Sequence, residues 1–446
     1  MALQQALFKV AINQQPEIVS ASAWSPLRHP LFRTLWIASL TSNIGTWMHE
    51  VGAAWLMTSL TLSPVMVALM QTAASLPIVL LALPAGAIAD VLDRRRTLLF
   101  TQGWMLISAA VLAALTVLDA TTPWLLLILT FGLGAGAAMN APAWQATTPE
   151  TVTRADIPAA VALTGLGLNI ARAVGPAVGG AIVTATGAWA VFLLNAASFL
   201  GVMVVLHGWR RAPQRKQSPS KPVLSAICEG IRYAWQAPAL RAVLVRTGLF
   251  VPFASALWAL LPLLVRHEVK LNCSGYGTLF GCLGMGAVIG AVFLPKLRSH
   301  FSTDTLVGGA TIMFAAATAA LAEVRHFGLL CLIMIVGGIA WGTLMASFNV
   351  ATQMAVPSSI RARALSLYLL VFHGGMAAGS ILWGAVTQHA GIAVALFGAA
   401  GGLIVSLLAM ARYPLEGSEQ SDLSPSTHRP ARAGERPTAN PYRLAP

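Results

Sequence analysis

A carboxylate inside a long apolar segment is the feature of this sequence most able to do chemistry. Glu50 lies in such a segment, and Asn43 and Trp47 share its helical face because the three follow the spacing i, i+4, i+7. A charge at the centre of a bilayer costs about 2.5 to 3.5 kcal/mol on insertion scales, so it needs a partner or a function. If this face lines a cavity, Glu50 would bind a proton when dehydrated and release it when hydrated, which predicts proton coupling or substrate contact. The alternative is that Glu50 lies near the outer surface and is simply hydrated.

Polar side chains in other apolar segments offer partners for this carboxylate. Arg172 keeps its charge, so we expect it to face the protein interior and pair with Glu50, with helix carbonyls or with an anionic substrate, unless it forms a purely structural ion pair. Asn169 precedes it by one turn on the same face. His373 suits proton transfer near neutral pH, although a lone membrane histidine more often joins two helices by a hydrogen bond. Two weaker cavity candidates, which would otherwise serve as interfacial or lipid-facing residues, are Arg246 and Trp258.

Membrane-spanning helices must position these side chains. The chain is 57% hydrophobic and 10% charged, whereas a soluble domain is about 25% charged, which excludes a soluble enzyme. Segments of roughly 20 apolar residues, separated by charged, proline-rich or glycine-rich breaks, predict an all-α integral membrane protein. The predicted spans are 31–58, 65–89, 97–118, 124–144, 159–186, 188–207, 240–265, 276–294, 305–322, 328–348, 365–387 and 392–411.

The distribution of basic residues divides the chain and orients it. Arginine and lysine accumulate between the spans on the side that carries both termini, and the positive-inside rule places that side in the cytoplasm. The net charge of +13 therefore lies in loops and tails, which argues against binding to nucleic acid. We expect a cytoplasmic N-terminal segment, a six-helix bundle, a basic cytoplasmic linker, a second six-helix bundle and a disordered cytoplasmic tail, at residues 1–30, 31–207, 208–239, 240–411 and 412–446.

The two bundles repeat one another in sequence. The run Gln145-x-x-x-Pro149 follows the fourth predicted span, and Gln353-x-x-x-Pro357 follows the tenth. The next span in each half carries a face of small residues that allows helices to approach closely. Parallel duplication of a helical unit is a mark of secondary transporters, which hold their substrate near the bilayer midplane between the halves.

The loop after the second span carries a family resemblance. The sequence from Gly86 to Arg96 is similar to the G-x-x-x-D-R-x-G-R-R/K signature of the major facilitator superfamily, with departures at Val91 and Asp93. The chain from about residue 30 to residue 412 resembles this superfamily, and the segments around Trp47 and Arg172 look most like its enterobactin and macrolide exporters. The resemblance implies two pseudo-symmetric six-helix bundles.

The same resemblance implies a cytoplasmic gate and a helix-packing motif. Asp90 would accept hydrogen bonds from a helix N-terminus of the other half and pair with Arg94, unless the arginines act only as topology signals. The implied gate residues are Gly86, Asp90, Arg94, Arg95, Glu150, Arg154 and Arg361. A glycine-rich run in the fifth span resembles a motif of antiporters and drug exporters, and its packing residues are Gly175, Pro176, Gly179 and Gly180.

These features predict a secondary transporter that works by alternating access. We expect a monomeric, proton-coupled exporter of small amphipathic compounds such as drugs or siderophores, in a bacterial cytoplasmic membrane. The alternatives are a proton-coupled importer of a small solute and a nontransporting receptor or scaffold of the same fold. The sequence has no G-x-S-x-G, H-E-x-x-H or G-x-x-x-x-G-K-S/T motif and no metal-ligand cysteine spacing, so we expect no enzymatic activity, no metal and no cofactor, with the proton gradient as the energy source.

Overall fold

A computed structural model describes residues 22–91, 93–209, 232, 237–357 and 360–415. The expected N-terminal segment up to residue 21, most of the expected linker and nearly all of the expected tail lie outside these residues. Within the described chain there are twelve helices of at least 21 residues and no strand, which confirms the predicted all-α class. These helices are α2 (Pro30–Leu60), α3 (Pro64–Val91), α4 (Arg94–Val117), α5 (Pro123–Thr151), α6 (Ile157–Thr186), α7 (Ala188–Gly208), α9 (Pro238–Leu263), α10 (Cys273–Arg298), α11 (Thr303–Glu323), α12 (Phe327–Met354), α13 (Arg361–Ala390) and α14 (Ile392–Arg412).

The helices are long and apolar enough to cross a bilayer. Ten helical segments of the described chain contain an apolar stretch of sufficient length, and α14 contributes a shorter one, Ile392–Leu408. The remaining helix, α2, is not among these segments, and it carries the polar stripe that includes Asn43 and Glu50. Three short helices lie between or before the long ones: η1 (Ser25–Arg28), η2 (Arg154–Asp156) and η3 (Leu264–Glu268).

Several helices extend further than the apolar pattern predicts, and two of them continue past the repeated glutamines. The fourth span was expected to end at residue 144, but α5 continues through Gln145 and Pro149 to Thr151. Likewise α12 continues through Gln353 to Met354. The sequence pattern follows only the part of a helix that needs an apolar surface, whereas hydrogen-bonded turns can continue into the polar layer beyond it. The repeated glutamines are therefore helical residues rather than the start of loops.

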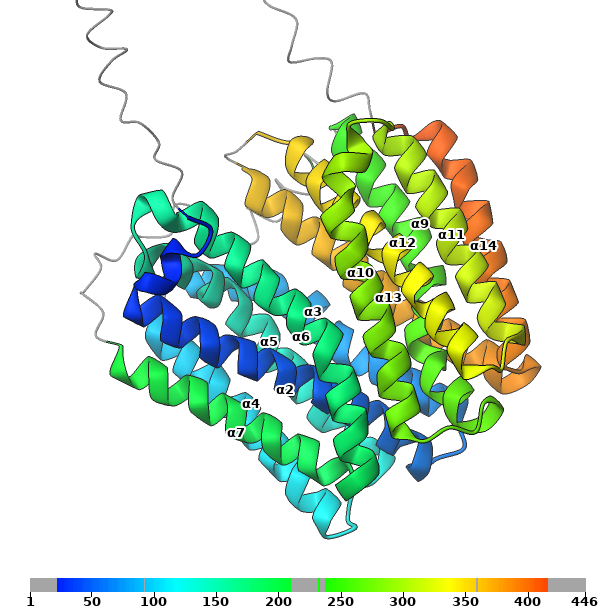
Figure 1. Cartoon of the computed structure of the whole chain (residues 1–446), viewed down its shortest axis with the longest axis horizontal. Helices are drawn as coiled ribbons and strands as arrows, with labels where there is room; N and C mark the ends of the chain where they lie inside the picture. Colours follow the sequence, from blue (N-terminus) through cyan, green and yellow to red (C-terminus); the bar gives the residue numbers. More distant parts are fainter. Residues whose placement is uncertain (1–21, 92, 210–231, 233–236, 358–359, 416–446) are drawn as a thin grey trace, which may run out of the picture.

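The twelve helices form two six-helix halves, α2 to α7 and α9 to α14 (Figure 1). Successive helices run in opposite directions, so all connections fall at two ends of the molecule. We call the end at which α2 begins and α14 ends the terminal end, and the opposite end the distal end. Figure 1 shows that α6 and α10, one from each half, diverge toward the terminal end.

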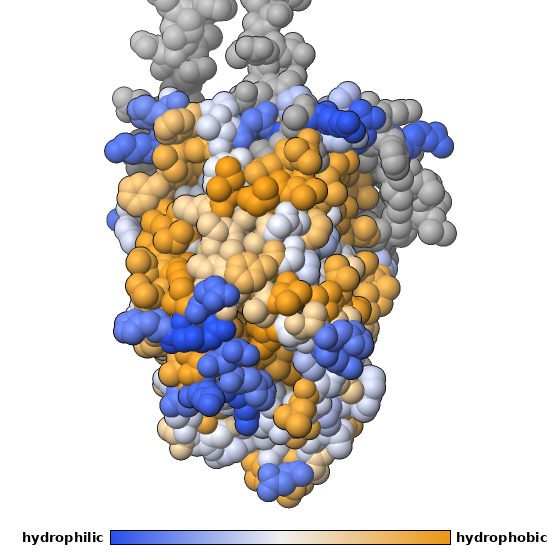
Figure 2. Space-filling view, turned by 90° about the vertical axis from the view of Figure 1, so that its right-hand side faces the viewer, coloured by the Kyte–Doolittle hydropathy of each residue, from blue (hydrophilic) through white to orange (hydrophobic). Residues whose placement is uncertain are grey.

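The surface carries a broad apolar belt between two more polar ends. Figure 2 shows this belt on the side formed by α11 and α14, with hydrophilic residues gathered above and below it. On α14 the exposed apolar side chains include Val394, Phe397, Val405 and Leu408. Such a belt on a protein whose helices have spanning length suits contact with lipid. The molecule is a multi-pass membrane protein.

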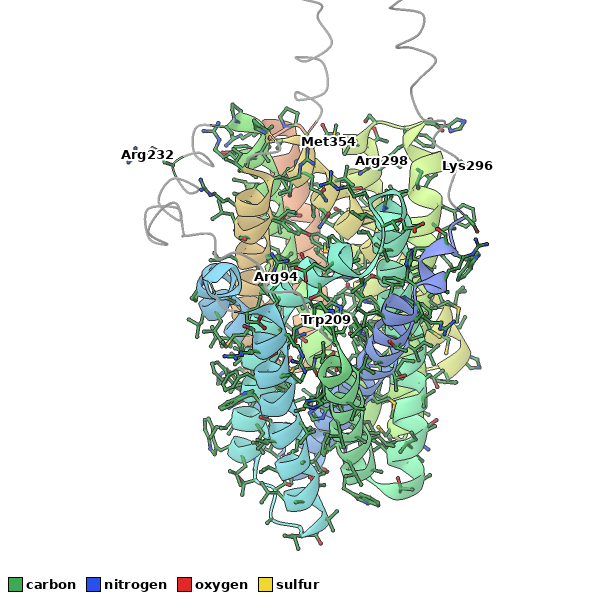
Figure 3. The ribbon with its side chains drawn as sticks, turned by 90° about the vertical axis from the view of Figure 1, so that its left-hand side faces the viewer. Arg94, Trp209, Arg232, Lys296, Arg298 and Met354 are labelled. Atoms are coloured by element: carbon green, nitrogen blue, oxygen red, sulfur yellow. The ribbon has the colours of Figure 1, made fainter. Side chains whose placement is uncertain are left out.

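Basic residues mark the terminal end. Figure 3 shows Lys296 and Arg298 at the end of α10, beside Met354 at the end of α12. At the same end η1 is fastened to η2, because the carboxylate of Asp156 accepts hydrogen bonds from Ser25 and Thr153 and lies 2.9 Å from the ring Nε2 of His29. These contacts tie the segment before α2 to the connection between α5 and α6.

Candidate functional site

The polar stripe on α2 lies on one accessible face of that helix. Asn43 and Trp47 are half-buried, and Glu50 is exposed. The side-chain amide of Asn43 donates to Ser39 one turn earlier, at 3.2 Å. Within the described chain, Glu50 makes no hydrogen bond and has no basic group within 4 Å. Its carboxylate is therefore not engaged by another described side chain through a hydrogen bond or a direct ion pair.

Arg172 of α6 lies beside this stripe. Its guanidinium carbon is 5.5 Å from the centre of a Trp47 ring, in a cation–π contact. Arg172 and Glu50 also interact electrostatically, without a direct ion pair. Asn169, one turn before Arg172, is half-buried. The structure thus brings together the acidic, basic and aromatic residues that the sequence singles out, from two helices that are distant in the chain.

Glycines of α6 allow this close approach. A Cβ on Gly175 would lie 2.6 Å from the Cβ of Trp47, and one on Gly179 would lie 2.7 Å from the Cα of Met48. Both distances are too short for real atoms, so only glycine permits α6 to pack against α2 here. These two glycines set the position of the helix that carries Arg172 relative to the stripe.

The opposite face of the same motif packs against the other half. A Cβ on Gly180 would lie 2.5 Å from the carbonyl oxygen of Cys273 and 3.0 Å from the Cα of Gly277, both on α10. Further along the same pair of helices, a Cβ on Gly284 would lie 2.5 Å from the carbonyl oxygen of Arg172. The helices α6 and α10 therefore touch backbone to backbone across the boundary between the halves.

Aromatic rings extend this contact to the distal end. Trp47 meets Phe280 edge-on with ring centres 5.9 Å apart, and Phe280 stacks on Tyr276 at 6.0 Å. Trp55 stacks on Tyr276 at 6.1 Å, and the guanidinium of Arg266 lies 5.2 Å from a Trp55 ring centre. We call this run of side chains the aromatic ladder; it consists of Trp47, Phe280, Tyr276, Trp55 and Arg266. It joins the halves from the level of Trp47 to the distal surface.

A second contact between the halves runs along α3 and α13. The hydroxyl of Thr72 donates to the carbonyl oxygen of Ala377 at 3.0 Å, and a Cβ on Gly384 would lie 2.6 Å from the Cβ of Ala68. Nearer the distal end, Ser63 donates to Gln388 at 3.4 Å. Like the α6–α10 contact, this one occupies the distal half of its helices. Together the two contacts close the distal end.

The gate residues expected at the terminal end are only partly brought together. Arg94 donates to the carboxylate of Glu150 at 2.5 Å and to the carbonyl oxygen of Ala146 at 3.1 Å, which links α4 to α5 within one half. Arg95 instead donates to the last carbonyls of α7, those of Leu206 and His207, at 2.8 and 2.6 Å. Arg154 and Arg361 are exposed. Gly86 and Asp90 lie in the last turns of α3, and the side chain of Asp90 is outside what the structure describes.

Asp93 explains one departure from the superfamily signature. Its carboxylate accepts from the backbone N–H of Arg96 at 3.0 Å, which makes it the N-cap of α4. This carboxylate satisfies a backbone N–H that has no partner within the helix, and its negative charge interacts favourably with the positive end of the helix dipole. The aspartate therefore stabilises the start of α4.

Three other candidates lie in the C-terminal half. Arg246 is buried and forms an ion pair with Asp304 of α11 at 2.6 Å, so it braces the terminal end of that half rather than extending toward an interface. Trp258 is half-buried and packs on Trp341, with ring centres 4.2 Å apart. His373 is half-buried beside Phe372, and its Nδ1 has no hydrogen-bond partner within the described residues. The structure does not join these three residues to the Glu50 stripe.

The sequence reasoning missed the aromatic ladder and its α10 partner. The signal was present, because α10 carries Gly277, Gly281 and Gly284 on one face, at the spacing i, i+4, i+7. Only the glycine runs of the fifth and eleventh spans had been identified as packing faces. Matching small-residue faces on helices of different halves would have predicted that they meet.

Comparison with known proteins assigns the chain to a family and a fold. The model of a family described as transmembrane secretion effector matches residues 21–439. The multidrug efflux pump Tap of Mycolicibacterium fortuitum is 27% identical over 385 residues, which cover 82% of this chain and 91% of that protein. The enterobactin exporter EntS of Citrobacter koseri is 26% identical over 395 residues, which cover 86% and 91%. These matches confirm the resemblance to major facilitator exporters.

Solved structures agree on the architecture. A mutant of the nucleoside transporter NupG superimposes with a TM-score of 0.70 at 16% identity, covering 86% of this chain and 99% of that one. A mutant of the peptide transporter POT gives 0.69 at 13% identity, covering 85% and 94%. At such low identity the likeness concerns the fold alone. It is the major facilitator fold.

Proposed function

The chain belongs to the transmembrane secretion effector family, and from that premise we propose that this transporter is a proton-coupled exporter of small amphipathic compounds. The observation that carries the proposal is the grouping of Trp47, Glu50 and Arg172 on helices that meet the boundary between the halves. A carboxylate beside a fixed positive charge can exchange a proton for a hydrogen-bonding or cationic group of a substrate. The indole ring offers an apolar surface next to both charges.

Alternating access is supported by where the halves touch. The α6–α10 and α3–α13 contacts and the aromatic ladder all lie toward the distal end. Exposure of Glu50 to the distal side requires these contacts to break and the terminal end to close. Glycine-to-carbonyl contacts suit such a movement because they separate without leaving an unpaired buried hydrogen bond.

Export is the direction that the relatives and the charge distribution support. The matched relatives are described as a multidrug efflux pump and an enterobactin exporter, which favours export of drugs or siderophores. The excess of basic residues at the terminal end supports a cytoplasmic position for that end in a bacterial inner membrane. Substrate would then enter between the halves from the cytoplasmic side.

Reconstitution into proteoliposomes tests the proposal. A pH gradient is imposed, and movement of ethidium, a planar cationic dye, is followed by fluorescence with and without a proton uncoupler. We expect uncoupler-sensitive transport by the wild type and by Glu323→Gln, which removes an exposed acid at the distal end of α11. Glu50→Gln should reduce this transport at least about tenfold, because it removes the exchangeable proton.

Two outcomes would contradict the proposal. Equal gradient-driven transport by Glu50→Gln and Glu323→Gln would remove Glu50 from the coupling step. The protein must have a known orientation in the vesicles, and the proton gradient must be directed from the distal side to the terminal side. Dye movement in that same direction would indicate import.

A further inference from the structure

The helices α10 and α12 lie side by side in the C-terminal half, and their backbones touch (Figure 1). A Cβ on Gly286 would overlap the carbonyl oxygen of Ile335, and one on Gly290 would overlap that of Ile339. Each contact advances by four residues on both helices, because α10 and α12 run in the same direction, from the distal end to the terminal end. We call this line of contact the α10–α12 seam. Its glycines let the two helices keep one register at close range.

Two cysteines continue this register one turn nearer the distal end. Cys282 lies four residues before Gly286, and Cys331 lies four residues before Ile335. Both carry free thiols, and the two thiols interact directly with each other through a hydrogen bond. A disulfide requires Cα atoms about 4.4 to 6.8 Å apart. Backbones that touch at the next turn of the seam provide the close approach that such a bond needs.

The cysteine pair lies at a surface that faces lipid. Cys282 and Cys331 are both half-buried rather than enclosed. Beside them, the apolar side chains of Met285 and Leu332 are 50% and 57% exposed. Exposed apolar side chains on membrane-spanning helices contact the hydrocarbon of the bilayer. A small apolar oxidant that is dissolved in the bilayer can therefore reach the two thiols.

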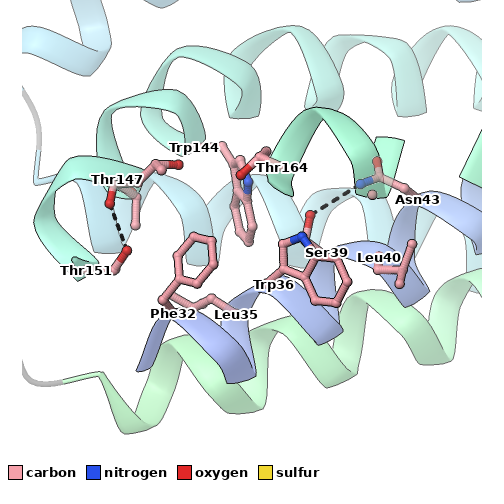
Figure 4. A pocket seen from close by; sticks show the side chains of 12 residues that line it. Phe32, Leu35, Trp36, Ser39, Leu40, Asn43, Trp144, Thr147, Thr151 and Thr164 are labelled. Carbon is pink, nitrogen blue, oxygen red and sulfur yellow. Dashed lines mark hydrogen bonds between the residues drawn. The ribbon is translucent and has the colours of Figure 1, made fainter. Parts of the chain in front are cut away.

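Neither cysteine belongs to the charged site. Asn43 of the polar stripe lies beside α5 and α6 of the N-terminal half, where its amide donates to Ser39 (Figure 4). On α10 the residues that face α6 are glycines such as Gly281 and Gly284, whereas Cys282 is turned toward α12. Chemistry at the cysteine pair therefore leaves the side chains of the charged site unaltered.

We propose that Cys282 and Cys331 are a redox-active pair, which a quinone dissolved in the bilayer oxidises to a disulfide between α10 and α12. Each thiol loses its hydrogen and the S–S bond forms. The two protons and two electrons reduce the quinone to a hydroquinone. Every reactant and product is uncharged, which suits a reaction in apolar surroundings. A dithiol reductant reverses the step, because it returns two hydrogens to the pair and becomes a disulfide itself.

The disulfide joins two helices that have different neighbours. Across the boundary between the halves α10 contacts α6, whereas α12 packs on α11 and α13 within its own half. Oxidation therefore ties the helix at the boundary to the interior of the C-terminal half. The bond closes a loop of about 50 residues, which restricts the unfolded chain and makes the oxidised protein more resistant to unfolding.

Mass spectrometry of the full-length protein in lipid nanodiscs tests the pair. The protein is fully reduced, then exposed without oxygen to decylubiquinone, a quinone whose ring has no free position to which a thiol could add. Thiols that remain are blocked with N-ethylmaleimide before digestion. Cys331→Ala and Cys282→Ala each remove one partner. Cys273→Ala is the matched control, because it removes a cysteine of α10 that is only 2% exposed.

We expect the wild type and Cys273→Ala to yield peptides joined by a disulfide between Cys282 and Cys331, with one hydroquinone formed for each bond. In Cys331→Ala the loss of the thiol of Cys282 should be at least about tenfold slower. Phenylarsine oxide, a neutral arsenical that bridges two neighbouring thiols with release of one water, should protect the wild-type pair from the quinone.

Three results would overturn the proposal. The first is a wild-type pair that the quinone leaves reduced, and the second is a disulfide that joins either cysteine to a different one. The third is phenylarsine oxide that bridges the pair while the quinone does not react, which would show neighbouring but redox-inert thiols. None of these results depends on which compound the protein transports, so the exporter function stands or fails separately.

Thermal unfolding measures what the bond does to the protein. The Tm of the oxidised wild type should exceed that of the reduced wild type by at least about 2 °C. Cys331→Ala should show one Tm under both treatments, and a Tm near that of the reduced wild type shows that this variant is folded. Equal Tm values for the oxidised and reduced wild type would refute the claim that the disulfide ties α10 to α12.

Discussion

Gly284→Ala should shift the protein toward a state whose distal end is open. The added Cβ would lie 2.5 Å from the carbonyl oxygen of Arg172, whereas a carbon and a carbonyl oxygen in contact are about 3.3 Å apart or more. The helices α10 and α6 must therefore separate by about 1 Å. Overpacking of this kind costs about 1 to 3 kcal/mol. Because only the distal-closed state contains the contact, its population relative to the distal-open state should fall by about one order of magnitude or more.

Cys273 reports this opening. It is 2% exposed at the distal start of α10, where its carbonyl packs on Gly180. In a variant that retains only this cysteine, a membrane-impermeant maleimide added to the distal side labels it when the end opens. We expect the labelling rate of Gly284→Ala to rise about tenfold over the parent.

Gly309→Ala is the control, since this α11 glycine has no atom within 4 Å of an added Cβ. Both changes favour helix by about 1 kcal/mol, so intrinsic helix propensity cancels between them. Equal labelling rates for the two variants would refute the claim that the α6–α10 contact holds the distal end closed. A slower rate for Gly284→Ala would refute it as well.

Two further predictions concern the terminal end. Asp304→Asn removes the ionic partner of the buried Arg246 and should lower the unfolding free energy by about 2 kcal/mol or more. Its Tm should be lower than that of the control Asp119→Asn, which changes an exposed acid, and equal Tm values would contradict a bracing role. Asp156→Ala removes both carboxylate oxygens that Ser25 and His29 contact, so amide hydrogen exchange at residues 25–28 should accelerate while that of the long helices stays constant. Unchanged exchange would show that other contacts hold this segment.

The helices of this fold follow from sequence because a spanning segment must be apolar over a fixed length, and the predicted spans match the observed helices except where helices enter the polar layer. The nearness of Glu50 and Arg172 could also be predicted from the sequence, because a charged side chain within an apolar bundle must face the interior or an opposite charge. The role of Arg246 could not be predicted from its residue type alone. Its partner, Asp304, lies in the first turn of α11. An acid at that position is equally expected to be solvated and to interact only with the positive end of the helix dipole.

The helix α6 connects the charged site to the distal closure through its backbone. One face of its glycine motif fixes α2 and hence the stripe with Glu50, whereas Gly180 and the carbonyl of Arg172 contact α10 of the other half. Trp47 belongs to both groups, since it contacts Arg172 on one side and Phe280 of the aromatic ladder on the other. Separating α6 from α10 therefore changes the surroundings of Arg172 and Trp47 at the same moment. We therefore expect a substrate or proton that alters the balance between Glu50 and the Arg172 guanidinium to act on a residue whose backbone also contacts the other half, which is the kind of link that the proposed coupling would require.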